Sequence, residues 1–221
     1  MRSAGLAAAL LASAAVLLPA AAPAQARRTL GLGIGVAPSW EETTIGGSVV
    51  SRSGLVVEGA AELAVALVEL DVFYRQGTLG APSGSDQRDL VEGQAMLGLR
   101  FVPWLKLEVG PRIRAYVTPV GTERWIFWEG RVLAAARVIR PAGWAYLRVG
   151  RVLKADLPGL ALDQGQGAEG ALELRLSRTP VWGRVSYWIH RASLSGGQRV
   201  ETIQGVSAGV RVRGGGGGER H

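Results

Sequence analysis

The sequence predicts an all-β protein, an antiparallel up-and-down transmembrane β-barrel of about ten strands, with eight strands as the alternative. Three observations predict this fold. Apolar and polar residues alternate with a period of two, tight and long connections alternate along the chain, and aromatic residues cluster beside both kinds of connection. The composition agrees, since 48% of the 221 residues are hydrophobic, 19% are charged and none is cysteine. A disulfide scaffold, a cysteine-ligated metal site and a thiol enzyme are thereby excluded.

Residues 1–26 have the composition of a secretory signal peptide. Arg2 precedes a run of alanine and leucine that ends at Pro19, and Ala24-Gln25-Ala26 closes the segment. The apolar run is too short for a membrane-spanning helix, which needs about 20 residues. The sequence therefore predicts three segments: a signal peptide (1–26), the barrel (27–213) and a disordered glycine-rich tail (214–221).

The alternation is clearest after residue 104, where Leu105, Leu107 and Val109 alternate with Lys106 and Glu108. A helix would scatter these charges around its circumference, whereas a strand places them all on one face. The same pattern elsewhere predicts ten strands, at about 28–38, 54–64, 66–76, 89–102, 104–117, 125–139, 144–154, 170–178, 181–191 and 202–213.

The connections between these strands fall into two classes. Tight turns are expected near residues 65, 103, 141 and 179, and longer loops at 39–53, 77–88, 118–124, 155–169 and 192–201. Short turns on one side and long loops on the other are typical of membrane barrels, in which the short turns face the periplasm.

Aromatic residues lie at both ends of the predicted strands. In a membrane barrel such residues form two outward belts at the two membrane–water interfaces. Those beside the tight turns are Phe101, Trp104, Trp144 and Trp182, and those near the long loops are Tyr74, Tyr116, Trp125, Trp128, Tyr187 and Trp188.

The polar face of the strands is rich in arginine and carboxylates. We expect it to line a narrow lumen, where the two kinds of side chain would form ion pairs. The candidate lumen charges are Glu69, Asp71, Glu92, Arg100, Glu108, Arg112, Arg114, Arg131, Arg148, Glu173, Arg175 and Arg184, with Glu58, Glu62, Arg75, Lys106, Glu129, Arg137 and Arg211 on the same face. Alternation alone also permits the reverse, a soluble periplasmic lipocalin-like barrel with its apolar face inside and a bound ligand.

In these patterns residues 27–213 resemble the small outer-membrane β-barrel proteins of diderm bacteria. The resemblance implies a bacterial outer-membrane location, with outer-membrane lipid and the barrel assembly machinery as partners. Such proteins serve as structural barrels, narrow pores, adhesins or lipid-acting enzymes. One departure concerns the last strand, which ends at Val212-Arg213 before five glycines and not at the aromatic residue usual in these proteins.

The sequence favours a non-enzymatic role, either a structural barrel or a narrow pore with mild anion preference. No metal site or cofactor is expected. The formal net charge of +7 does not indicate nucleic-acid binding, because basic and acidic residues are interleaved along the strands. Gly31, Gly33 and Gly35 have the period of a strand and are expected to make room in the lumen for arginines. The oligomeric state is not indicated.

An enzymatic alternative rests on His190, Ser193 and Glu201. They resemble the catalytic residues of outer-membrane lipid A deacylases, in which a histidine activates a serine. The spacing departs from that family, because Arg191 and Ala192 separate the histidine from the serine and no asparagine follows. The simpler interpretation of His190 is a polar ring that faces the lumen. The several acidic residues that an omptin-type protease would set opposite a histidine are not visible as a motif.

Overall fold

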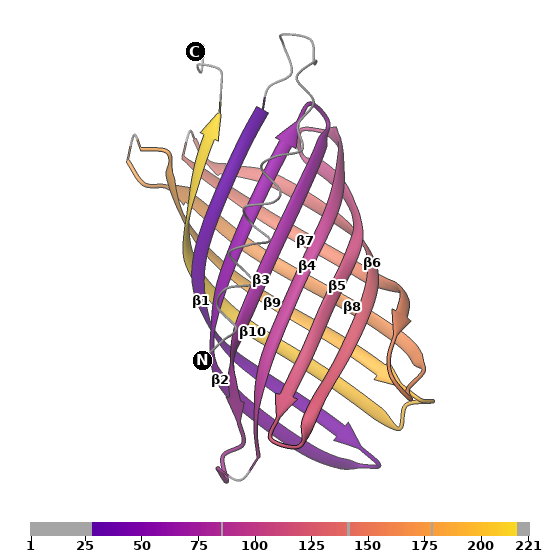
Figure 1. The fold of residues 1–221 in the computed structure, drawn as a ribbon. Coiled ribbons are helices and arrows are strands. Elements are labelled where there is room, and N and C mark those ends of the chain that lie inside the picture. The colour runs from indigo at the N-terminus through magenta and orange to yellow at the C-terminus, as the bar shows by residue number, and fades with distance from the viewer. Residues whose placement is uncertain (1–27, 85, 141, 178, 216–221) are drawn as a thin grey trace.

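The structure, a computed structural model, describes residues 28–215 except 85, 141 and 178. Neighbouring strands pair antiparallel, and β1 pairs with both β2 and β10, so the sheet closes into a barrel (Figure 1). The prediction of ten strands is confirmed, and the alternative of eight is wrong. The strands are β1 (Arg28–Ile45), β2 (Ser48–Val65), β3 (Val68–Gly80), β4 (Gln87–Val102), β5 (Leu105–Thr118), β6 (Gly121–Ile139), β7 (Gly143–Asp156), β8 (Leu162–Arg175), β9 (Val181–Leu194) and β10 (Arg199–Gly215).

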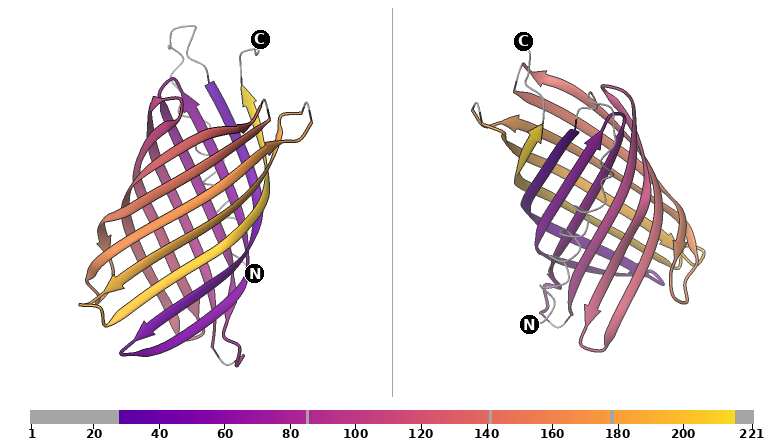
Figure 2. Two further views of the ribbon diagram at one scale, coloured as in Figure 1. Left: turned by 180° about the vertical axis from the view of Figure 1, so that it is seen from behind. Right: turned by 45° about the horizontal axis from the view of Figure 1, so that its top comes forward.

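The barrel has two distinct ends. The start of β1, the end of β10 and the connections β2–β3, β4–β5, β6–β7 and β8–β9 lie together at what we call the turn end, at the top of Figure 1. The other five connections lie at the loop end. The strands run obliquely to the barrel axis, as Figure 2 shows from behind and with the top tilted forward. Among the described residues, no helix is long and apolar enough to cross a membrane.

Several predicted loops are strands in the structure. The expected loop at 39–53 is a continuous hairpin whose turn is Gly46-Gly47, both with positive φ, and the loop expected at 155–169 is reduced to residues 157–161. The serine, threonine and glutamate residues of these segments resemble a loop in composition. They nevertheless form strands, because the backbone pairing between neighbouring strands continues through them. Some of them, such as Glu41 and Thr43, point into the barrel and are buried there.

The segment boundaries are only partly covered by the described residues. The predicted signal peptide lies outside them, as does the end of the predicted tail. The strand β10 extends to Gly215, two residues beyond the expected end of the barrel at 213.

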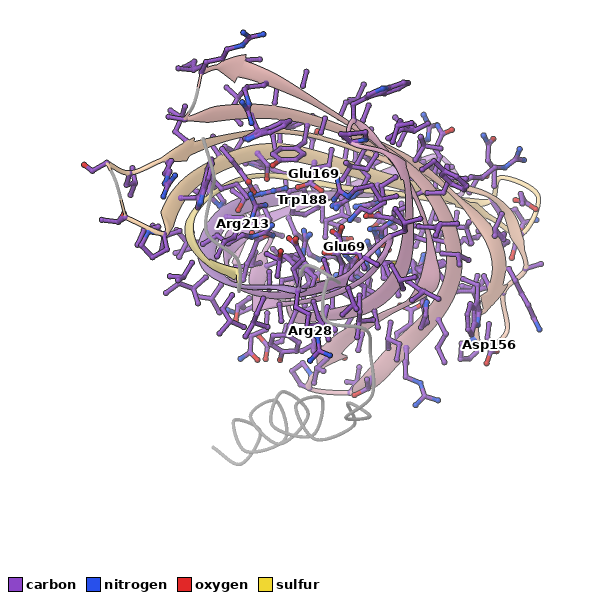
Figure 3. The ribbon with its side chains drawn as sticks, turned by 90° about the horizontal axis from the view of Figure 1, so that it is seen from above. Arg28, Glu69, Asp156, Glu169, Trp188 and Arg213 are labelled. Atoms are coloured by element: carbon purple, nitrogen blue, oxygen red, sulfur yellow. The ribbon has the colours of Figure 1, made fainter. Side chains whose placement is uncertain are left out.

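The two faces of the wall differ in chemistry. Outward positions are apolar and exposed, with Ile34 72% and Leu147 56% exposed. Inward positions alternate with them and hold buried charges, such as Glu92 and Arg112. Figure 3, seen from the turn end, shows Glu69, Glu169 and Arg213 inside the ring of strands and Arg28 and Asp156 at its periphery. The barrel is therefore polar inside and apolar outside over much of its length.

Candidate functional site

The interior near the turn end is filled by a turn-side charge layer. Its centre is Lys106, which is 2% exposed and contributes Nζ to three carboxylates, at 2.5 Å from Glu69, 2.7 Å from Asp71 and 2.8 Å from Glu108. The inward parity of β3 and β5 brings these groups together from adjacent parts of the sheet. A single ammonium group thus holds three strand-borne carboxylates.

The rest of this layer consists of bridging arginines. Arg148 lies 3.1 Å from Glu108 and 2.6 Å from Glu169, and Arg184 lies 2.5 Å from Glu169 and 2.8 Å from Glu173. The circle continues through Arg211, Arg213 and Glu62. Each of these bridges joins two different strands, some neighbouring and some not, so the layer ties the wall together from within.

A middle charge layer lies nearer the loop end. Glu92 faces three arginines, at 2.7 Å from Arg114, 3.4 Å from Arg75 and 4.0 Å from Arg112. Glu129 completes the layer with contacts to Arg112 at 3.3 Å and to Arg131 at 2.6 Å. Arginine suits this setting because its planar head donates to several acceptors at once.

Between the middle layer and the loop end, an apolar closing layer crosses the barrel. Every strand contributes an inward side chain to it, and Leu157 and Leu160 of the β7–β8 loop pack into it from the loop end. Tyr116, Trp125 and Phe127 form its centre through edge-to-face ring contacts with centroids 5.8 and 6.0 Å apart. Its other members are Ala37, Val56, Leu79, Leu90, Val152, Ala155, Leu162, Trp188, Ala192, Leu194 and Ile203.

On the turn-end side of this closing layer, the charged interior encloses a cavity of about 460 Å³. Its lining includes Ala66, Pro103 and Trp182 near the turn end and Trp188 and His190 toward the closing layer. Nine basic and seven acidic side chains line it, so its wall has a small excess of positive charge. The cavity therefore reaches from the turn end to the middle of the barrel.

The predicted lumen charges all take inward positions on their strands. Glu69, Asp71, Arg100, Arg112, Arg131, Arg148, Glu173 and Arg184 line the cavity, and Glu92, Glu108 and Arg114 are buried in the ion pairs around it. Arg175 lies at the turn end, where its Nε donates to the carbonyl of Thr179 at 2.9 Å. Arg137 is exposed at the same end, with its guanidinium 4.9 Å from the ring centre of Trp144.

The predicted aromatic belts are only partly present. Phe101, Trp104, Trp128 and Tyr187 are exposed on the outer face, and Tyr74 points outward on β3. Tyr116, Trp125 and Trp188 instead belong to the apolar closing layer, and Trp144 and Trp182 line the cavity, so assigning these five to outward belts is wrong. The reason is strand parity, because all five occupy inward positions on their strands.

The residues of the hydrolase alternative are not brought together. Nη1 of Arg112 donates to Nδ1 of His190 at 2.7 Å, and Glu201 accepts from Arg114 and from the hydroxyl of Tyr116. Ser193 lies at the rim and its Oγ donates to Asp163. Ser193 is three positions after His190 on the same strand, and an odd offset places two side chains on opposite faces of a strand. The structure therefore contradicts this triad.

The one carboxylate cluster with metal-ligand spacing consists, among the described residues, of Glu62, Glu69 and Asp71, whose oxygens lie within 4.8 Å of one another. Lys106 and Arg100 already contact Glu69, and Arg211 contacts Glu62. The side chains of Lys106, Arg100 and Arg211 thus occupy the positions around these carboxylates. The cluster therefore belongs to the turn-side charge layer.

A loop-end ion-pair group was missed by the sequence analysis. Glu41 accepts from Arg52 and from the Nε of Arg88 at 2.7 Å, and Arg88 stacks 3.6 Å from the ring centre of Tyr116. Arg52 also pairs with Asp86. Glu41 and Arg52 lie in the segment expected to be a loop. The alternation of Ser39, Glu41 and Thr43 with Trp40 and Glu42 was the signal that continued the strand.

No protein-family model and no curated protein matches the chain. Among solved structures, it is similar to the outer membrane protease OmpT of Escherichia coli, with 9% identity, a TM-score of 0.61, and coverage of 85% of this chain and 97% of that one. The NalP translocator domain of Neisseria meningitidis (11% identity, TM-score 0.42, 94% of each chain) and an outer membrane channel of Pseudomonas putida F1 (8% identity, TM-score 0.42, 90% and 100%) also match. The likeness to OmpT establishes the fold shared with outer-membrane β-barrel proteins.

Proposed function

We propose that this protein is a structural barrel of the bacterial outer membrane, with lipid against its outer wall and its lumen closed at the loop end. The observation that carries the proposal is the inversion of the two faces. Leu, Ile and Val side chains are exposed along the outer wall, whereas charged side chains are buried within it. Exposure of so large an apolar band to water would cost free energy, and contact with the hydrocarbon core of the membrane removes that cost.

The same observation argues against the soluble ligand-binding barrel. A lipocalin-like barrel needs an apolar interior and a polar exterior. Here the interior from the turn end to the middle holds two charge layers, and the continuous cluster of buried apolar side chains is the closing layer at the loop end. Sixteen charged side chains line the cavity that remains, whereas a lipocalin-like pocket is apolar.

The closing layer supports a structural role over a passive pore. Its central side chains are inaccessible to water, with Trp125 0% exposed, and every strand contributes to it. A continuous aqueous path would have to displace these side chains. We therefore expect no conductance from the folded barrel, and the excess of arginine in the cavity would favour anions only after the layer is opened.

The location is tested by migration of the membrane-fraction protein in SDS gels, unboiled against boiled. A closed membrane barrel resists SDS because it has no strand edge from which to unravel, so the unboiled band should run at a different position. The absence of a shift, with recovery of the protein in a detergent-free osmotic-shock fraction, would overturn the proposal in favour of the soluble barrel.

The closed lumen is tested in planar lipid bilayers. The wild-type protein should give no conductance steps, and Trp125→Gly combined with Phe127→Gly should give steps while the gel shift is retained. The matched control is Trp128→Gly, because Trp128 faces outward on the same strand. Steps from the wild-type protein would instead support the narrow anion-leaning pore.

A further inference from the structure

We propose that the outer wall over β7, β8 and β9 binds one phosphorylated lipid of the outer leaflet, with its phosphate between Arg151 and Arg191 and an acyl chain in the groove on their turn-end side. The inference rests on the proposed outer-membrane location, and it assigns a specific lipid site to that surface.

The headgroup part of the site is a row of polar side chains across three strands. The register places Arg151 opposite Gln166 and Gln166 opposite Arg191. All three are exposed outward positions. Adjacent strands are about 4.8 Å apart, so the two arginines are separated by about 10 Å at the backbone. Arginine side chains are long enough for both guanidinium groups to reach a single phosphate placed over Gln166.

These arginines differ from those of the interior. Within the described residues, neither Arg151 nor Arg191 forms an ion pair or a side-chain hydrogen bond, whereas the arginines of both charge layers do. The register continues the row from Arg191 to Thr202 and then to Glu42 of β1, so no carboxylate lies between the two arginines. Two neighbouring guanidinium groups without carboxylate partners at a membrane surface favour the binding of a phosphate anion.

The acyl part of the site is a shallow groove of about 390 Å³ in the outer wall. Gly170 forms its floor, since a side chain at that position would meet nothing within 4 Å. The sides are formed by Ala145, Leu172, Val185, Tyr187 and Val206. The lining is apolar and the groove opens toward the lipid, which suits a hydrocarbon chain and not a polar ligand.

The two parts are aligned along the same strands. Gly170 lies four residues from Gln166 on β8, and Tyr187 lies four residues from Arg191 on β9, so groove and arginines are about 13 Å apart along the wall. Trp128 lies on the adjacent strand β6, exposed on the outer wall near the level of the row, and the strand register places it opposite Lys154. An aromatic residue is expected at the level of the lipid headgroups. A phosphorylated lipid has the same arrangement, with a charged headgroup next to an apolar chain. Free phosphate would contact only the two arginines and not the groove.

The experiment uses the refolded full-length barrel in detergent micelles, with its heat-shifted migration checked first. Lipid binding is measured by native mass spectrometry during titration with dioleoyl phosphatidic acid, and with dioleoyl phosphatidylcholine as the zwitterionic lipid with the same chains. The variants are R151Q/R191Q for the headgroup and G170L for the groove. The matched control is R124Q, which removes an exposed arginine of β6 outside the row.

We expect preferential binding of phosphatidic acid and a loss of roughly 30-fold in affinity in R151Q/R191Q, from about fivefold for each basic residue at a membrane surface. G170L should weaken phosphatidic acid binding, and R124Q should not. Equal binding by R151Q/R191Q and R124Q, equal binding of the two lipids, or displacement of the lipid by equimolar inorganic phosphate would each overturn the site. Loss of the heat shift in the wild-type protein would instead overturn the membrane location.

Discussion

Lys106 offers the sharpest test of the charged interior, because one ammonium group holds three carboxylates. Replacing it with methionine keeps the length of the side chain and removes the charge. Glu69 retains Arg100 at 2.7 Å and Glu108 retains Arg148 at 3.1 Å. Asp71 has no second ion pair within the described residues. The variant therefore leaves one buried carboxylate without its cation.

Removal of one partner from a buried ion pair costs about 3–5 kcal/mol. Since two of the three carboxylates keep an arginine, we expect Lys106→Met to lower the free energy of unfolding by about 3 kcal/mol, the lower end of that range. Combining it with Asp71→Asn removes the unpaired charge and should restore part of the loss.

The measurement is urea unfolding of the barrel in lipid vesicles, followed by the gel shift and by tryptophan fluorescence. The midpoint should fall while the dependence on urea stays the same. The control is Lys154→Met, because Lys154 is the only other lysine and is exposed, so its replacement should change stability by less than about 0.5 kcal/mol. A loss below about 1 kcal/mol for Lys106→Met would refute the role given to the turn-side charge layer.

Two further predictions concern side chains whose roles the structure defines. His190→Ala should lower the free energy of unfolding by about 2 kcal/mol, because Arg112 loses a charged hydrogen bond. Ser193→Ala should change it by less than about 0.5 kcal/mol, and a loss of lipid hydrolysis in either variant would revive the hydrolase interpretation. Gly110→Ala should destabilise the barrel by about 3 kcal/mol, the upper end of the usual cost of overpacking, because its Cβ would lie 2.0 Å from the carbonyl oxygen of Ala95. Gly59→Ala meets open space and should be neutral or slightly stabilising, and equal effects of the two alanine substitutions would contradict the packing at Gly110.

Strand parity carries most of the information that the sequence holds about this barrel. Lys106, Glu108, Arg112 and Arg114 alternate with apolar residues, and this pattern predicts both the strand and its inward face. The same parity places Tyr116 inward with the arginines. Tyr116 lies near a predicted loop, and this position suggested a place in an outward aromatic belt. Side chains two positions apart on a strand lie on the same face, however, so Tyr116 faces inward with Arg114.

The closing layer was not predicted, because it depends on contacts across the whole barrel. Leu79 and Leu90 occupy inward positions, yet nothing local in their strands shows that they belong to one buried cluster with Ile203 from the far end of the sequence. The same holds for the pairing of Arg114 with Glu201. Which inward charges face each other is set by closure of β1 on β10 and by the stagger of the strands, and a period-two pattern specifies neither.

The central claim, lipid outside and charge inside, is tested most directly by site-directed spin labelling along β5. The chain has no cysteine, so single cysteines at positions 106–109 and 112–114 can be labelled without background. In lipid vesicles, labels at 107, 109 and 113 should collide with oxygen dissolved in the bilayer, and labels at 106, 108, 112 and 114 should not. Collision of the labels at 107, 109 and 113 with a water-soluble nickel complex would contradict the account, because it would place the apolar face of β5 in water.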